Sequence, residues 1–168
     1  SRTTGAPIAM MLYNKDIRSD DYDDIKDKFR PGHADYTFLK KFGIRDWRGS
    51  GRASGRETAA RVAAGAIAKK LLKKHKIEVV AYTLEVAGIR AEKIDLKQIE
   101  KNPLRCPDKD VAKEMIKKIE NIKEEGDSVG GLVQIQVKGI PPGLGEPVFD
   151  KLDADLATAL ISIGAVKG

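Results

Sequence analysis

Apolar residues recur at intervals of three and four along an alanine-rich stretch of the chain, which predicts a helix over residues 55–74. Ser54 and Glu57 form the S-x-x-E capping pattern at its N-terminal end. The same spacing predicts a helix over 111–125, and Pro147 followed by early aspartates predicts another over 148–163. The periodic positions of the first helix are Ala59, Val62, Ala63, Ala66, Ile67 and Leu71.

Other segments have the residue pattern of strands. Residues 7–14 are an apolar run with a polar end, 77–89 are rich in β-branched residues, and 131–140 alternate apolar and polar side chains. The acidic segment 16–25 and the sequence GDSVGG at 126–131 are interpreted as a loop and a turn. Strands and helices in this order predict mixed layers, with helices packed on sheet.

Length and composition limit the class of protein. The chain has 168 residues, of which 41% are hydrophobic, and this suits one domain with a core of its own. No apolar stretch approaches the roughly 20 residues that cross a bilayer, and no secretory leader is evident, so we expect a soluble protein without a membrane partner. The single cysteine, Cys106, cannot form an internal disulfide, which favours a cytoplasmic location.

Positive charge is concentrated in one region. Residues 26–76 contain 15 Lys/Arg against four Asp/Glu, whereas the rest of the chain contains 16 against 21. Such segregation indicates an anionic partner, but charge alone leaves nucleic acid, a membrane surface, a phosphorylated metabolite and a cofactor all open.

The Gly/Ser-rich loop RGSGRASGRE at 48–57, which leads into the alanine-rich helix, is the strongest candidate site. Six arginines lie between Arg30 and Arg61. Guanidinium groups fit phosphate and carboxylate, and a helix N-terminus adds free backbone N–H groups. The loop matches neither the Walker A nor the GxGxxG pattern, which disfavours the common nucleotide-binding folds.

His33, in RPGHAD, is the candidate proton-transferring group, whereas His75, in KKHK, is interpreted as a solvated helix-end residue.

Several segments together resemble chorismate synthase. They are TTGAPIAMMLYN at 3–14, RPGHAD at 30–35, GIRDWRGSGRASGRETAARVAAGAIAK at 43–69, GDSVGG at 126–131 and GLGEPVFDKLDADLATALISIGAVKG at 143–168. The resemblance implies a shikimate-pathway lyase that converts 5-enolpyruvylshikimate 3-phosphate to chorismate by 1,4-elimination of phosphate. It implies reduced FMN as cofactor, with NADPH needed only if the parent enzyme reduces its own flavin.

The same resemblance implies an α+β fold, a β-α-β sandwich with helices between antiparallel sheets, and a homotetramer. Residues 1–168 would be the central part of a single domain, without the family's N-terminal GESHG segment and its C-terminal region. We therefore expect this polypeptide alone to have little or no turnover.

The resemblance also assigns roles to residues. His33 would be catalytic, protonating or stabilising the reduced flavin, and no metal is implied. The substrate would be bound by Arg30, Gly55 and Arg56, and the flavin by Arg52, Ala53, Ser54, Gly164 and Ala165. Three of these positions depart from residues usual in the family, which has serine at 53, alanine at 55 and often asparagine at 164.

Two alternatives stay open at this point. One is a nucleic-acid-binding module built on residues 26–76, with Trp47 and Tyr36 as stacking groups. The low aromatic content, 5% of residues, disfavours it. The other is a noncatalytic, purely structural piece of chain.

Overall fold

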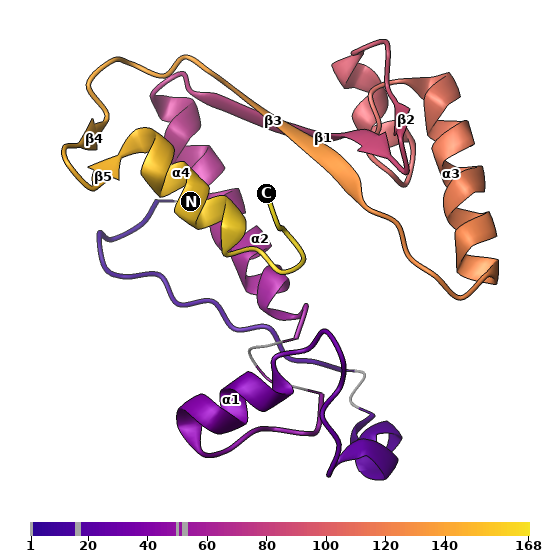
Figure 1. Ribbon diagram of the computed structural model, residues 1–168. Coiled ribbons are helices and arrows are strands. Elements are labelled where there is room, and N and C mark those ends of the chain that lie inside the picture. Colours follow the sequence, from indigo (N-terminus) through magenta and orange to yellow (C-terminus); the bar gives the residue numbers. More distant parts are fainter. Residues whose placement is uncertain (1, 16–17, 50, 52–53) are drawn as a thin grey trace. The chain divides into compact units, whose positions relative to one another are not determined.

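The computed structural model describes residues 2–15, 18–49, 51 and 54–168. The chain divides into two compact units (Figure 1). The first unit contains residues 1–70 and 141–168, and the second contains residues 71–140. Both contain helices and antiparallel strand pairs, which confirms the α+β class; the layering of a β-α-β sandwich stays a prediction.

A three-stranded antiparallel sheet with the order β2-β1-β3 is the basis of the second unit. Strand β1 (Glu78–Val86) pairs with β3 (Gly131–Lys138), and both strands were predicted. The segment 77–89, however, was predicted as one strand, whereas β1 ends at Val86 and the chain passes through a tight turn into β2 (Ile89–Arg90). Ala87 and Gly88 form this turn with φ of 52° and 82°, as a two-residue hairpin of type I′ requires.

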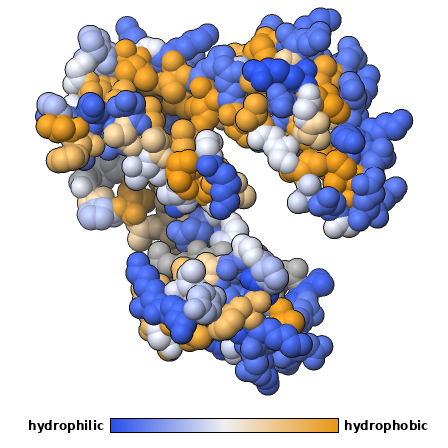
Figure 2. All heavy atoms as spheres, viewed as in Figure 1, coloured by the Kyte–Doolittle hydropathy of each residue, from blue (hydrophilic) through white to orange (hydrophobic). Residues whose placement is uncertain are grey.

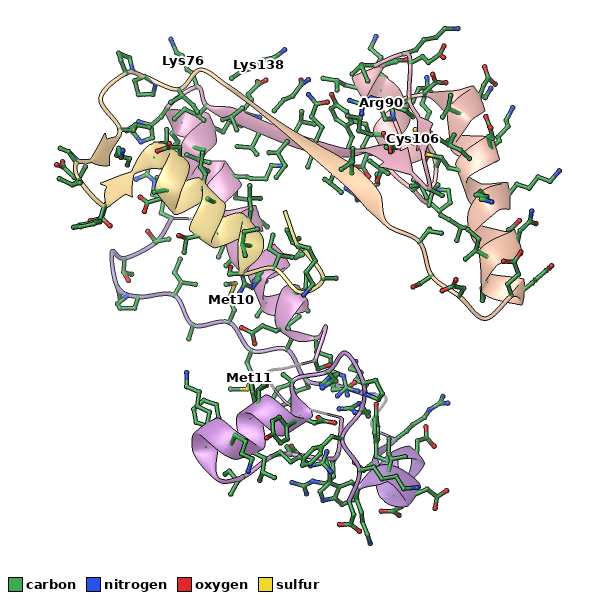
Figure 3. All side chains as sticks on the ribbon, viewed as in Figure 1. Met10, Met11, Lys76, Arg90, Cys106 and Lys138 are labelled. Carbon is green, nitrogen blue, oxygen red and sulfur yellow. The ribbon has the colours of Figure 1, made fainter. Side chains whose placement is uncertain are left out.

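Helix α3 (Lys109–Glu124) covers one end of this sheet and completes the core. It begins two residues before its predicted start because Asp108 caps it, accepting hydrogen bonds from Asp110 N and Val111 N. A 3-10 helix, η3 (Leu96–Lys101), precedes it. Figure 3 shows Cys106 within the cluster between the end of β1 and α3. The buried members of this cluster are Val86, Ala91, Cys106, Ala112 and Met115.

Replacing Met115 with alanine should destabilise the second unit by about 2–5 kcal/mol, because this side chain is fully buried and its loss leaves a cavity. Lys117→Ala, at an exposed position on the same helix, is the matched control and should change stability by about 0.5 kcal/mol or less. Urea unfolding of the two variants measures the difference. Equal midpoints would show that the cluster does not stabilise the unit.

Helix α2 (Glu57–Lys74) begins two residues later than predicted, and α4 (Leu152–Ile161) is shorter than the predicted 148–163. The start of the latter prediction is wrong because Gly145–Glu146 (β4) pairs with Asp150–Lys151 (β5) in a short antiparallel hairpin. Gly145 permits this close approach, since a Cβ there would lie 2.5 Å from Leu152 N.

Two further expectations for the first unit were wrong. Residues 7–14 form no strand and are exposed, and Met10 and Met11 project from an extended segment (Figure 3). Within the described ranges this segment has no neighbouring strand to pair with, and an unpaired apolar run cannot form a ladder. Part of the expected acidic loop is a 3-10 helix, η1 (Ser19–Ile25). Helix α1 (Asp35–Phe42) was not predicted.

Apolar side chains remain exposed on several elements. Helix α2 has no buried residue, and Val62 is 67% exposed. On β3, Val133 and Ile135 are exposed, and Figure 2 shows hydrophobic atoms along the ribbon of β1 and β3. Among the described residues, no helix is both long enough and apolar enough to span a bilayer.

Candidate functional site

A single buried carboxylate, that of Asp35, organises the candidate site in the first unit. Asp35 is the first residue of α1 and only 3% exposed. Arg30 donates to it three times: from Nε to Oδ2 over 3.0 Å, from Nη2 to Oδ1 over 3.1 Å, and from its backbone N to Oδ2 over 3.2 Å. Arg45 adds a second guanidinium, with Nη1 at 3.2 Å from Oδ2. One carboxylate therefore holds two arginines.

The ionised state of Asp35 determines how His33 is held. Hydrogen bonding from the Arg30 side chain lowers the pKa of Asp35 to about 2, so the carboxylate is charged at neutral pH and only accepts hydrogen bonds. His33 Nδ1 lies 3.1 Å from Asp35 Oδ1 and 3.3 Å from Arg30 Nη2, which itself donates to Asp35 Oδ1. Because the carboxylate can only accept and is the nearer partner, we assign the proton of the neutral imidazole to Nδ1. Among the described residues, Nε2 then has no hydrogen-bond partner and can accept a proton.

Two glycine turns bring these groups together. At Pro31–Gly32 the chain reverses, with φ of 70° at the glycine and a 3.2 Å hydrogen bond from His33 N to Arg30 O. After α1, Gly43 ends the helix in the left-handed conformation, and Arg45 follows two residues later. The short helix and its two turns thus direct Arg30 and Arg45 to the same carboxylate.

Aromatic rings pack against both guanidinium groups. The Cζ atom of Arg30 lies 5.5 Å from the centroid of Tyr22, and that of Arg45 lies 5.2 Å from the centroid of Phe29. Phe29 in turn meets Tyr36 edge to face, with ring centroids 5.4 Å apart. These cation–π contacts hold the arginines in place while keeping their charge.

Arg56 lies in the same neighbourhood. Gly49 is buried with φ of 96°, and a Cβ added to it would lie 3.2 Å from Arg56 Nη1 and 3.8 Å from Tyr22 Cε2. Gly49 thus lies near both Arg56 and Tyr22, the ring that also packs against Arg30. In the part of the chain that the structure describes, no carboxylate lies within ion-pair distance of Arg56, whose charge is available to an external anion.

The structure brings two of the predicted residues, Arg30 and His33, into contact, while Arg56 is linked to them only through Gly49 and Tyr22. Ser54 precedes α2 and its hydroxyl accepts a 3.3 Å hydrogen bond from Arg56 N, while Gly55 is exposed beside it. The predicted Arg52 and Ala53 lie outside the described residues.

Gly164 and Ala165, the other predicted flavin residues, lie in an exposed turn after α4. Ala165 has φ of 69° there. Among the described residues, no group of three or more His, Cys, Asp or Glu is placed to hold a metal ion.

Sequence reasoning missed Arg45 and Tyr22. Arg45 was noted only as one of six arginines in the basic stretch, and its pairing with Asp35 depends on the turn at Gly43. Tyr22 lies in the segment that was interpreted as an acidic loop. The aspartate in RPGHAD was the available signal, because a carboxylate two residues after a histidine and five after an arginine can bond to both.

The residues suggested as nucleic-acid stacking groups have other surroundings. Tyr36 packs edge to face on Phe29, and Lys40 Nζ lies 5.6 Å from the centroid of its ring. Trp47 is half-buried beside a shallow hollow of about 320 Å³ that is lined by residues 44–48. Tyr36 is still 52% exposed, so these surroundings do not decide the nucleic-acid alternative.

Comparisons with known proteins agree with the motifs. The family model for chorismate synthase matches residues 1–168. The chain is 58% identical over 167 residues to the chorismate synthase of Desulfosudis oleivorans, covering 99% of this chain and 47% of that protein. It is 55% identical over 167 residues to that of Chloroflexus aurantiacus, covering 99% of this chain and 46% of that protein.

A solved structure is also similar. It is described as "Crystal Structure of Chorismate Synthase", with a TM-score of 0.71 and 31% sequence identity over 80% of this chain and 46% of that one. The chain spans about half the length of the curated relatives it matches.

The fold and the site define an α+β protein that gathers arginines around an Asp–His pair. The chain belongs to the chorismate synthase family, which confirms the resemblance found in its motifs.

Proposed function

We propose that the protein, in its full-length natural form, is a lyase of the shikimate pathway that converts 5-enolpyruvylshikimate 3-phosphate to chorismate and inorganic phosphate. In this 1,4-elimination the carbon–oxygen bond to phosphate breaks and the phosphate departs with the bonding electron pair. A ring C–H bond breaks as well, its electrons enter the new double-bond system, and its hydrogen leaves as a proton. The observation that carries the proposal is the imidazole held by Asp35 beside arginines, in a chain of this family.

The substrate is an anion with phosphate and carboxylate groups, and we assign it to Arg30, Gly55 and Arg56. The guanidinium of Arg56 has no carboxylate partner among the described residues, which suits it to an incoming phosphate. Arg30 shares Asp35 with Arg45, so one carboxylate faces two guanidinium groups. No atom of the described residues lies within 4 Å of the Cβ position of Gly55, which leaves space for a ligand beside the backbone. Fixed charges of this kind stabilise a departing phosphate without reorganisation.

The reaction requires reduced FMN, and the described residues that we assign to it fit such a group in one respect. Gly164 and Ala165 are exposed, and no described atom lies within 4 Å of the Cβ position of Gly164, so a ligand can approach the backbone there. We assign the flavin to Arg52, Ala53, Ser54, Gly164 and Ala165. When bound, reduced FMN supplies electron density to the allylic system of the substrate.

His33 is the group we propose for proton transfer at the cofactor. Asp35 keeps the proton of the neutral imidazole on Nδ1 and orients the ring, so that Nε2 holds or releases the proton that reaches the reduced cofactor. The same arrangement fixes the imidazole against rotation, because Nδ1 is bonded to a buried carboxylate. His33 is thus catalytic, and Asp35 and Arg30 are positioning residues for it.

The remaining proposals concern the whole protein. We propose that residues 1–168 are the central part of a single domain and have little turnover alone. The full-length form would be a cytoplasmic homotetramer, which needs NADPH only if it reduces its own flavin. Many exposed apolar side chains, among them Val62 and Val133, support the view that further chain or subunits cover this part.

The test combines two measurements on the full-length protein. Fluorescence titration should show FMN binding that Arg52→Ala weakens, whereas Lys69→Ala, at an exposed site on α2, should leave it unchanged. Phosphate release from 5-enolpyruvylshikimate 3-phosphate under anaerobic conditions should require reduced FMN. Absence of FMN binding, together with oligonucleotide binding that weakens steeply with salt, would instead support the nucleic-acid module.

A further inference from the structure

The contact between α2 and the end of α4 joins two segments that are 101 residues apart. Arg61 Nη1 donates to Ser162 Oγ over 2.9 Å, and Arg61 Nη2 donates to the carbonyl oxygen of Ser162 over 3.2 Å. These bonds join the C-terminal end of α4 to the N-terminal part of α2 (Figure 1). Both ends of the contact belong to the first unit.

Ser162 is the C-cap residue of α4, directly after Ile161, and its groups suit a guanidinium partner. Its carbonyl belongs to the last turn of the helix, where no intrahelical N–H is available, and the helix dipole is negative there. Its hydroxyl donates to Ala159 O over 2.7 Å, so the oxygen is oriented to accept the bond from Arg61. A single guanidinium thus satisfies both acceptors, which an ammonium cannot do in the same fixed geometry.

The turn at Gly164–Ala165 follows this contact directly in the chain. Gly164 comes two residues after Ser162, and the turn closes with a hydrogen bond from Val166 N to Ile163 O over 3.2 Å. Arg61 lies about one helical turn after Glu57, the first residue of α2. The turn at Gly164–Ala165 is thereby tied to the N-terminal part of the helix that Ser54 precedes.

We propose that Arg61 is a positioning residue that holds the turn at Gly164–Ala165 in register with the start of α2, so that the two segments form one cofactor-binding surface. This inference rests on the proposed function, because it was there that Ser54, Gly164 and Ala165 were assigned to the flavin. Arg61 itself does not contact the cofactor in this proposal. It acts through Ser162.

The test measures FMN affinity of the full-length protein by fluorescence titration, with Arg61→Ala, Ser162→Ala and the double variant. Arg61→Ala should raise the dissociation constant for FMN about 10-fold, whereas Lys69→Ala, which removes the same charge from an exposed site on α2, should leave it within about twofold. Ser162→Ala should have a smaller effect, since the carbonyl acceptor remains. The double variant should be no weaker than Arg61→Ala, because both substitutions remove one interaction.

If Arg61 is a positioning residue, two further results are expected. Saturating FMN should restore the rate of phosphate release by Arg61→Ala, and the melting temperature should match that of Lys69→Ala. If wild-type protein binds no FMN, the proposed function fails and this inference fails with it. If wild-type binds FMN but Arg61→Ala binds it equally well, or the two single effects add in the double variant, this inference alone is overturned.

Discussion

Replacing His33 with asparagine should lower the kcat for chorismate formation by at least about 100-fold, the lower end of what a positioned acid–base group contributes. Asparagine is the informative substitute because its amide nitrogen takes the place of Nδ1 and can donate to Asp35. It offers no counterpart to Nε2 that can take up or release a proton. A fall in rate with unchanged stability would therefore reflect proton transfer rather than loss of the Asp35 cluster.

The other histidine of the chain is the matched control. His75 is exposed just after α2, so His75→Asn should leave kcat within about twofold of wild type. Both variants are measured in the full-length protein, with phosphate release under anaerobic conditions and saturating reduced FMN. A His33→Asn enzyme that keeps more than a third of the wild-type rate would remove the histidine from the mechanism.

Asp35→Asn is expected to destabilise the first unit by about 3 kcal/mol, because breaking a buried ion pair leaves its partners without compensation. The two guanidiniums of Arg30 and Arg45 would then face a neutral group, with side chains only 25% and 12% exposed. Asp46→Asn is the control, since it also removes one carboxylate that is paired with an arginine. Its bond to Arg48 is largely exposed, and its loss should cost about 1 kcal/mol or less.

Urea unfolding at neutral pH compares the two variants, and equal losses of stability would show that Asp35 does not hold the site together. Acid gives an independent measurement. The pKa of Asp35 is lowered in the folded protein to about 2 by hydrogen bonds from Arg30, so its contribution is present above about pH 4. That contribution, about 2 kcal/mol, should disappear as the pH falls from about 4 to 2, and Asp35→Asn should lack this part of the acid transition.

Periodicity predicted the regular elements well, because it depends only on neighbours along the chain. The helices at 57–74 and 109–124 and the long strands at 78–86 and 131–138 lie within two or three residues of their predicted bounds. The segment 7–14 was mispredicted for the opposite reason, since a strand also needs a partner that the pattern cannot supply. The hairpin at Ala87–Gly88 was missed because alanine rarely adopts positive φ.

The candidate site was predicted in its residue types and less fully in its geometry. RPGHAD pointed to His33 and Arg30, which lie together because they are close in sequence. Arg45 joins them only through the turn after α1, and Tyr22 only through the fold of η1, so neither could be assigned from spacing. That a carboxylate would be the centre of a cluster of arginines is likewise a property of the folded chain.

The complete burial of Cys106 gives the second unit a built-in probe. Burial raises the pKa of this thiol, and its Sγ lies 3.5 Å from Asp108 O, within a cluster that also buries Met115. A buried, protonated thiol reacts slowly with alkylating reagents, so labelling requires the cluster to open. Because Cys106 is the one cysteine of the 168-residue chain, its labelling rate would report the local opening of the second unit. The same rate would not report motions around Asp35.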